Sequence, residues 1–159
     1  MVYVYTTLNE LNKYSQKKLS IDEISQALID MGMDLKGQSE DENSELKIEI
    51  TAEKFDMISS IGIARAINSY LELQEPVINI PLIRGKERVI VDESVKEVRP
   101  KTVAVIVRNL DLNAEKLQQI IDVQEKIHES FGRHRKKAAI GIYPIENISF
   151  PIYFKALPP

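Results

Sequence analysis

The sequence predicts an α+β fold with mixed sheets, because two kinds of pattern follow one another in groups rather than in strict alternation. Short runs rich in β-branched and aromatic residues predict strands. These runs cover residues 2–5, 46–51, 88–92, 102–107, 138–142 and 152–154. Apolar residues that recur every three or four positions predict helices. These helices cover residues 8–14, 21–31, 57–74 and 114–131.

Residues that favour helix ends stand at the borders of the helical runs. Ser20 and Glu23 have the spacing of a capping box, in which each side chain satisfies a free backbone amide of the other residue. We expect Thr7, Asp56 and Asn113 to be the N-caps of the other three helices. These residue types accept hydrogen bonds from the first amides of a helix, so they support the predicted boundaries.

The strand candidates differ in how deeply they should be buried. Residues 46–51 alternate apolar and polar side chains, which predicts a strand with one solvated face. Residues 102–107 are apolar on both faces and β-branched, which predicts a strand buried inside a sheet. Residues 39–45 are polar and acidic, and we interpret them as a mobile, solvated loop between two strands. Residues 77–86 form an extended connection, where we expect the domain boundary.

The composition fits one domain or two small ones. With 159 residues and 43% hydrophobic residues, the chain can bury a core. The net charge is −3, and residues 1–86 contain 9 basic and 14 acidic side chains, whereas residues 87–159 contain 12 and 10. This asymmetry fits two modules. No apolar run approaches the ~18 residues of a membrane span, and no signal peptide is recognisable, so we expect a cytoplasmic protein without a membrane contact.

The residues that usually carry catalysis or hold metals are scarce. The chain has no cysteine, which excludes disulfides and thiolate sites, and it has two histidines, so we predict no metal site. Phosphate-binding glycine loops and serine-hydrolase motifs are absent from the sequence, and we assign no catalytic residue. We interpret Glu125 and Glu129 as partners of Lys126 on a helix surface, and His128 as a partly buried structural residue.

The most distinctive stretch is a group of cations directly after the predicted helix 114–131, where Gly132 is expected to end the helix. Its members are Arg133, His134, Arg135, Lys136 and Lys137. Cations beyond a helix C-terminus are stabilised by about 0.3–1 kcal/mol by the helix dipole, so a solvated helix end explains them. The same cations could neutralise nucleic-acid phosphates or the acidic patch of a partner protein. His134 is either a surface loop residue or a neutral imidazole that contacts a ribose or base.

Several segments, which follow one another from Glu49 onward, carry a resemblance to a known family. They are Glu49-Ile50-Thr51-Ala52 with Asp56, then Gly62-Ile63-Ala64-Arg65-Ala66, Arg99-Pro100, Gln124-Glu125-Lys126-Ile127-His128, and the stretch from Gly132 to Gly141. Together they resemble the N-terminal part of the β subunit of phenylalanyl-tRNA synthetase in its archaeal and eukaryotic-cytosolic form. The chain departs from the family at Glu53-Lys54-Phe55-Asp56, where the family usually has Asn-Arg-Pro-Asp, and at Pro144 and Glu146.

The resemblance implies a division of the chain and a function. Residues 1–85 would be a small N-terminal α+β module, and residues 87–159 the incomplete beginning of a mixed-sheet editing domain. In the family that domain hydrolyses tyrosine wrongly attached to tRNA(Phe), while ATP-dependent aminoacylation takes place elsewhere in the enzyme. The segment alone would be inactive and without a cofactor, and ATP and Mg²⁺ would belong to the whole enzyme. The implied partners are tRNA(Phe) and the α subunit, in an α2β2 heterotetramer.

The resemblance and the positive charge together imply a site for RNA. Arg133, His134, Arg135, Lys136 and Lys137 would lie near the acceptor end of a tRNA and hold its phosphates. A competing hypothesis is a free-standing, non-catalytic α+β module whose basic loop docks RNA or a protein. An independent hydrolase is disfavoured because its motifs are missing from the sequence.

Overall fold

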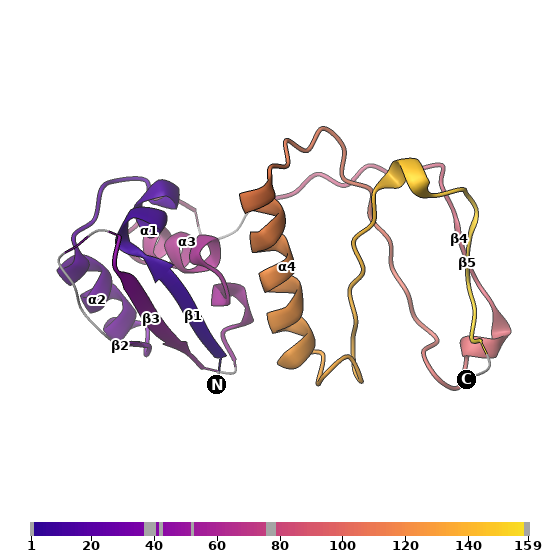
Figure 1. Ribbon diagram of the computed structural model, residues 1–159, viewed down its shortest axis with the longest axis horizontal. Helices are drawn as coiled ribbons and strands as arrows, with labels where there is room; N and C mark the ends of the chain where they lie inside the picture. Colours follow the sequence, from indigo (N-terminus) through magenta and orange to yellow (C-terminus); the bar gives the residue numbers. More distant parts are fainter. Residues whose placement is uncertain (1, 37–40, 42, 52, 76–78, 158–159) are drawn as a thin grey trace. The chain divides into compact units, whose positions relative to one another are not determined.

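The computed structural model describes residues 2–36, 41, 43–51, 53–75 and 79–157 (Figure 1). The elements are β1 (Val2–Thr7), α1 (Leu8–Tyr14), α2 (Ile21–Asp30), β2 (Asp34–Lys36), β3 (Glu45–Ile50), η1 (Phe55–Met57), α3 (Ser60–Tyr70), β4 (Val89–Val91), η2 (Glu93–Val95), α4 (Ala114–Glu129), η3 (Ile145–Asn147) and β5 (Ile152–Phe154). The predicted α+β class is confirmed. The chain forms two compact units: unit 1 comprises residues 1–79 and 113–140, and unit 2 residues 80–112 and 141–159. The predicted division near residue 86 stays a prediction.

In unit 1 the described strands form an antiparallel sheet with the order β1-β3-β2. Val4 pairs with Ile48, and Tyr5 pairs with Lys47. Because side chains alternate between the faces of a strand, Val4 and Ile48 are buried while Tyr5 is about half exposed. The prediction of a strand with one solvated face at residues 46–51 is confirmed.

Three helices, α1, α2 and α3, cover the apolar face of this sheet (Figure 1). Their inward stripes join the inward side chains of the strands in one hydrophobic core. The largest fully buried apolar side chains of this core are Val4, Leu11, Leu19, Ile24, Leu28, Leu46, Ile48, Ile50, Ile63 and Ile67. Each such side chain contributes about 1.5–3 kcal/mol by leaving water, so the core holds unit 1 together.

The predicted N-caps are confirmed for three of the four helices. The Ser20 hydroxyl accepts from the Glu23 amide at 3.2 Å, and the Glu23 carboxylate accepts from the Ser20 amide at 2.9 Å, which completes the capping box. Thr7 caps α1 and Asn113 caps α4, each through a side-chain oxygen that accepts a backbone amide of the first turn.

The prediction that Asp56 caps the third helix is wrong. α3 begins later, with Ser59 as its N-cap, and the Ser59 hydroxyl accepts from the Gly62 amide at 3.1 Å. Asp56 lies in the short turn η1, which packs against α3 so closely that a Cβ at Gly62 would be 2.1 Å from the Asp56 carbonyl oxygen. A glycine at this position therefore allows η1 to touch the helix.

Two predicted segment boundaries include residues that the structure does not describe. Of the acidic stretch 39–45, positions 39, 40 and 42 are not described. α3 ends at Tyr70, before the Glu75-Pro76 pair that was predicted to end it, and residues 76–78 are not described. After Tyr70, the Leu71 amide still donates to the Ile67 carbonyl at 2.9 Å, so the helical hydrogen bonds extend to the C-cap residue Leu71.

Helix α4 packs within unit 1 against α1. The Lys13 ammonium lies 3.0 Å from the Glu115 carboxylate, and the Tyr14 hydroxyl donates to the Gln119 side chain at 3.3 Å. Leu117, on the predicted apolar face of this helix, is nevertheless 44% exposed, so this face is incompletely buried. No helix in the described part of the chain has the length and apolarity needed to cross a membrane.

In unit 2, the predicted strands at 88–92 and 152–154 are confirmed as β4 and β5, which pair in parallel. The predicted buried strand at residues 102–107 is wrong in this structure. That run forms no strand, and Val103 is 93% exposed. A strand buried on both faces needs neighbouring strands on both sides. In the described part of unit 2, β4 and β5 pair only with each other.

Replacing Gly62 with alanine tests the close packing of η1 on α3. Alanine is the better helix former by about 1 kcal/mol, which alone would stabilise the protein. The new Cβ would meet a backbone oxygen, however, and overpacking of this kind costs about 1–3 kcal/mol or more. We expect Gly62→Ala to lower the free energy of unfolding, measured by urea denaturation.

The matched control is Arg65→Ala on the exposed face of the same helix, which should change the free energy of unfolding by less than about 0.5 kcal/mol. A Gly62→Ala variant as stable as the parent protein would contradict the close approach.

Candidate nucleic-acid interface

The basic loop, residues 133–137, begins where α4 ends. α4 ends at Glu129, slightly before Gly132, and the Ser130 hydroxyl bonds to the Lys126 carbonyl at 2.5 Å. A Cβ at Gly132 would lie 2.6 Å from the Ala138 carbonyl oxygen and 2.8 Å from that of His128. Gly132 is therefore the point where the returning chain crosses the helix end, and a side chain there would block the crossing.

The basic loop has an unusual backbone. Arg133, His134 and Arg135 have φ values of 49°, 53° and 65°, the left-handed region that costs about 1–2 kcal/mol per non-glycine residue. Two backbone hydrogen bonds close the turn: the Lys136 amide donates to the Arg133 carbonyl at 3.2 Å, and the Lys137 amide donates to the Gly132 carbonyl at 2.8 Å. Such a conformation persists only where surrounding contacts enforce it.

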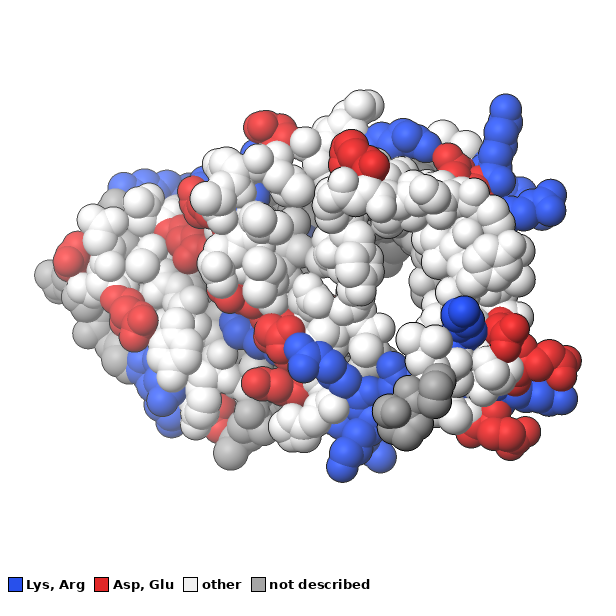
Figure 2. Space-filling view, turned by 45° about the vertical axis from the view of Figure 1, so that its right-hand side comes forward, with Lys and Arg blue, Asp and Glu red and all other residues white. Residues whose placement is uncertain are grey.

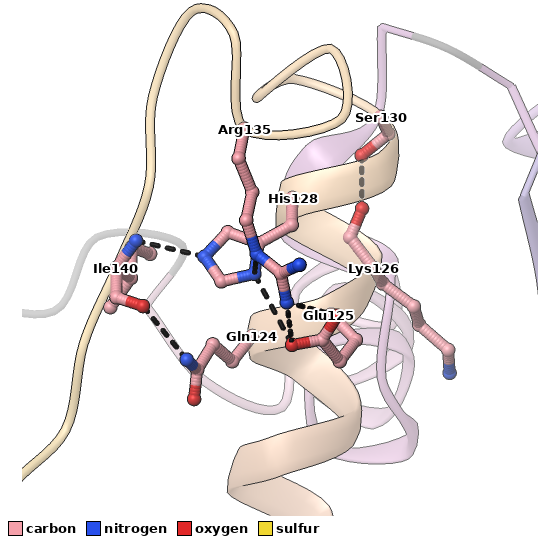
Figure 3. A network of polar contacts seen from close by, with 7 residues as sticks. All are labelled: Gln124, Glu125, Lys126, His128, Ser130, Arg135 and Ile140. Atoms are coloured by element: carbon pink, nitrogen blue, oxygen red, sulfur yellow. Dashed lines mark hydrogen bonds and ion pairs between the residues drawn. The ribbon is translucent and has the colours of Figure 1, made fainter. Parts of the chain in front are cut away.

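His128 on α4 holds the chain that leaves the turn. It is 3% exposed, which confirms the prediction of a structural histidine. The Ile140 amide donates to His128 Nε2 at 2.8 Å, while Nδ1 lies 3.3 Å from the Glu125 carboxylate (Figure 3). A backbone N–H can only donate, and so can the Arg135 Nε–H, which is directed at Nδ1 at 3.1 Å. A neutral ring accepts at one nitrogen only. We assign that role to Nε2, because the Ile140 contact is shorter and Arg135 has the Glu125 carboxylate as its acceptor, so the ring proton lies on Nδ1, facing Glu125.

Ile140 is bound to α4 through both of its backbone groups. Gln124, one turn before His128, donates its side-chain amide to the Ile140 carbonyl at 2.7 Å (Figure 3). The prediction of a strand at residues 138–142 is therefore wrong: where a strand would pair with another strand, Ile140 pairs with helix side chains. The sequence pattern was apolar enough for a strand, but it contains no information about the pairing partner.

Arg135 points back toward the helix rather than outward. One guanidinium nitrogen lies 2.7 Å from both oxygens of Glu125, and Nε lies 3.1 Å from His128 Nδ1 (Figure 3). The guanidinium and the imidazole thus converge on one carboxylate. Glu125 was predicted to pair with Lys126; in the structure it pairs with Arg135. Lys126 is half-buried, and this burial lowers the pKa of its ammonium below the ordinary value.

The other cations of the basic loop face solvent. Within the described part of the chain, the side chains of Arg133 and His134 have no hydrogen-bond or ion-pair partner. The Lys137 ammonium lies 4.2 Å from the ring centroid of Phe131, a cation-π contact. The segment 132–142 contains no acidic residue. Acidic and basic side chains are interspersed on the face seen in Figure 2, so the loop is a local positive site rather than part of a large positive field.

Two aromatic residues beside the loop were missed by the sequence analysis. Phe55 in η1 and Phe131 after α4 meet edge to face, with ring centroids 5.5 Å apart and an interplanar angle of 76°. No sequence signal links them, because the contact joins distant segments. Among the described residues, no group of three or more His, Asp or Glu side chains could hold a metal ion.

Comparisons with known proteins agree with this architecture. The phenylalanine–tRNA ligase β subunit of Saccharomyces cerevisiae is 29% identical over 149 residues, which covers 90% of this chain and 25% of that subunit. The β subunit of Methanocella arvoryzae is 32% identical over 157 residues, 96% of this chain and 28% of that subunit. The crystal structure of an N-terminal fragment of the phenylalanyl-tRNA synthetase β subunit from Pyrococcus horikoshii has a TM-score of 0.83 at 30% identity, covering 97% of this chain and 45% of that chain. No family model matches the chain.

In sequence and fold the chain is therefore similar to subunits of an aminoacyl-tRNA synthetase. It matches the N-terminal part of phenylalanine–tRNA ligase β subunits, which confirms the resemblance found in the sequence. The chain spans about a quarter of the length of the curated relatives it matches.

Replacing His128 with leucine tests the role of the imidazole. The Ile140 amide would lose its acceptor, and the loss of one hydrogen bond costs about 0.5–1.5 kcal/mol. We expect a lower free energy of unfolding and faster hydrogen exchange at the Ile140 amide, measured by NMR.

The control is Gln118→Ala, an exposed position on the same helix, which should leave the Ile140 exchange rate as it is in the parent protein. Unchanged exchange in His128→Leu would show that the imidazole does not hold the returning chain.

Proposed function

We propose that the chain is the N-terminal part of a phenylalanine–tRNA ligase β subunit that helps to position tRNA(Phe) and contributes to the editing domain that hydrolyses mischarged tyrosyl-tRNA(Phe). The observation that carries the proposal is the match of 97% of the chain to the Pyrococcus horikoshii β-subunit fragment. In this proposal ATP- and Mg²⁺-dependent aminoacylation takes place elsewhere in a cytoplasmic α2β2 enzyme. The hydrolytic step is assigned to no residue of this chain.

The open structure of unit 2 supports the assignment of residues 87–159 to the beginning of a larger domain. The run 102–107 has the composition of a central strand, yet Val103, Val105 and Val107 are all more than half exposed. A two-stranded pair such as β4–β5 is marginally stable by itself. In a subunit of the relatives' length, further strands could cover this run and extend the pair.

The basic loop supports the assignment of tRNA as ligand. Arg133, Lys136 and Lys137 supply positive charge in a segment free of acidic residues, and phosphate neutralisation by such side chains releases counterions. His134 is exposed beside Arg133 and can reach a ribose or a base. Arg135 was predicted to hold a phosphate too. Its guanidinium is engaged by Glu125, so in the present proposal it shapes the loop and the other four residues contact RNA.

A charge deletion tests the RNA contact. In the intact enzyme that contains this chain, Arg133→Ala should weaken tRNA(Phe) binding and reduce the slope of log K against log salt by about 0.7–0.9, the value for one lost phosphate contact. Arg65→Ala removes the same charge from the exposed face of α3 and serves as the matched control. The proposal fails if the two variants have the same affinity and slope.

The alternative, a non-catalytic binding module, is favoured by one observation: unit 1 has a closed core of its own. The two functions predict different assemblies. A ligase subunit should co-purify with an α subunit and support attachment of phenylalanine to tRNA(Phe), as measured by aminoacylation with labelled phenylalanine. A binding module should do neither, and that result would replace the ligase proposal with the alternative.

A further inference from the structure

The exposed pair Phe55–Phe131 is the feature that the proposed function leaves unexplained. Phenylalanine is usually buried, yet these side chains are 38% and 43% exposed. In an edge-to-face pair, the edge of one ring meets the face of the other, so at least one ring face stays open. The pair therefore presents an aromatic surface to solvent.

Both rings sit on elements that are held in place. η1 carries Phe55 and touches α3 at Gly62, where no side chain would fit. Phe131 is the residue before Gly132, whose amide donates to the Ile127 carbonyl at 2.7 Å and whose Cα faces the crossing chain. The aromatic surface is thus prearranged, and a ligand that stacks on it would lose little free energy in ordering the protein.

One cation contacts the aromatic pair, and others lie close to it in sequence. The Lys137 ammonium lies over the Phe131 ring, and Arg133 follows Phe131 by two residues. Phe55 lies between Lys54 and Asp56 in the sequence. An apolar protein surface that covered the rings would also remove these cations from water, which is costly. Single-stranded nucleic acid fits both the rings and the cations, since its bases stack on aromatic rings and its phosphates pair with cations.

We propose that Phe55 and Phe131 form a stacking platform for an unpaired nucleotide of an RNA whose phosphates the basic loop holds. This inference rests on the proposed function, because it takes RNA as the ligand, and it adds that the recognised part is single-stranded. Lys137, on its flexible stem, exchanges the Phe131 ring for a phosphate when RNA binds.

The probes are fluorescently labelled octa-adenylate and a blunt-ended RNA duplex, and binding to the intact enzyme is measured by anisotropy at several salt concentrations. Phe55→Leu keeps an apolar side chain and removes the ring. Loss of one stacked base costs about 1–3 kcal/mol, so we expect octa-adenylate binding to weaken by about 5- to 150-fold. The salt slope should stay as in the parent enzyme, because no phosphate contact is lost. Tyr5→Leu, which removes an exposed ring on the sheet of unit 1, is the control and should bind normally.

Each outcome decides a separate point. If Arg133→Ala weakens binding of both RNAs and Phe55→Leu weakens neither, the stacking platform is refuted and the RNA contact of the proposed function stands. If both variants bind like the parent enzyme, the RNA contact fails together with the platform. If Phe55→Leu weakens duplex and octa-adenylate equally, the ring has no preference for unpaired bases and the platform is refuted. Phe131→Leu provides the same comparison if Phe55→Leu does not fold.

Discussion

The hydrogen bond from the Ile140 amide to the buried His128 imidazole anchors the chain that leaves the basic loop. It fixes the chain that returns past the end of α4, and with it the separation between the helix end and residue 140. Within that closed span the chain must turn sharply, and it does so through three consecutive left-handed residues. Without the imidazole, the Ile140 amide would lose its described acceptor, while Gln124 would still hold the Ile140 carbonyl and the backbone hydrogen bonds of the turn would remain.

The same interaction explains why Arg135 differs in role from Arg133 and His134. Arg135 is drawn inward because the carboxylate of Glu125 lies beside the His128 ring, where both groups can donate to it. An exposed ion pair is worth at most about 1 kcal/mol, so the value of this one lies in its geometry. It leaves Arg133 and His134 at the outer side of the turn, where a ligand can reach them. A loop that is shaped before binding loses less entropy when a ligand arrives.

Local signals were sufficient to predict much of unit 1. The capping box at Ser20 and the alternation in β3 depend on residues close in sequence, and both predictions are confirmed. The cap of α3 was misassigned because Asp56 and Ser59 are equally good caps, and only the packing of η1 on Gly62 decides between them. The run 102–107 has a strand composition, but a buried strand needs partners that the described part of unit 2 does not provide.

The candidate site was predictable in its charges and not in its shape. The cations are visible in the sequence, whereas the inward turn of Arg135 and the pairing of Phe55 with Phe131 arise from contacts between distant segments.

The most direct test of the role assigned to His128 is a long-range ¹⁵N–¹H NMR correlation spectrum of its ring at neutral pH. The Ile140–His128 hydrogen bond predicts a neutral ring with its proton on Nδ1 and none on Nε2. A proton on Nε2, alone or together with one on Nδ1, would contradict it, because the imidazole could not then accept the Ile140 amide.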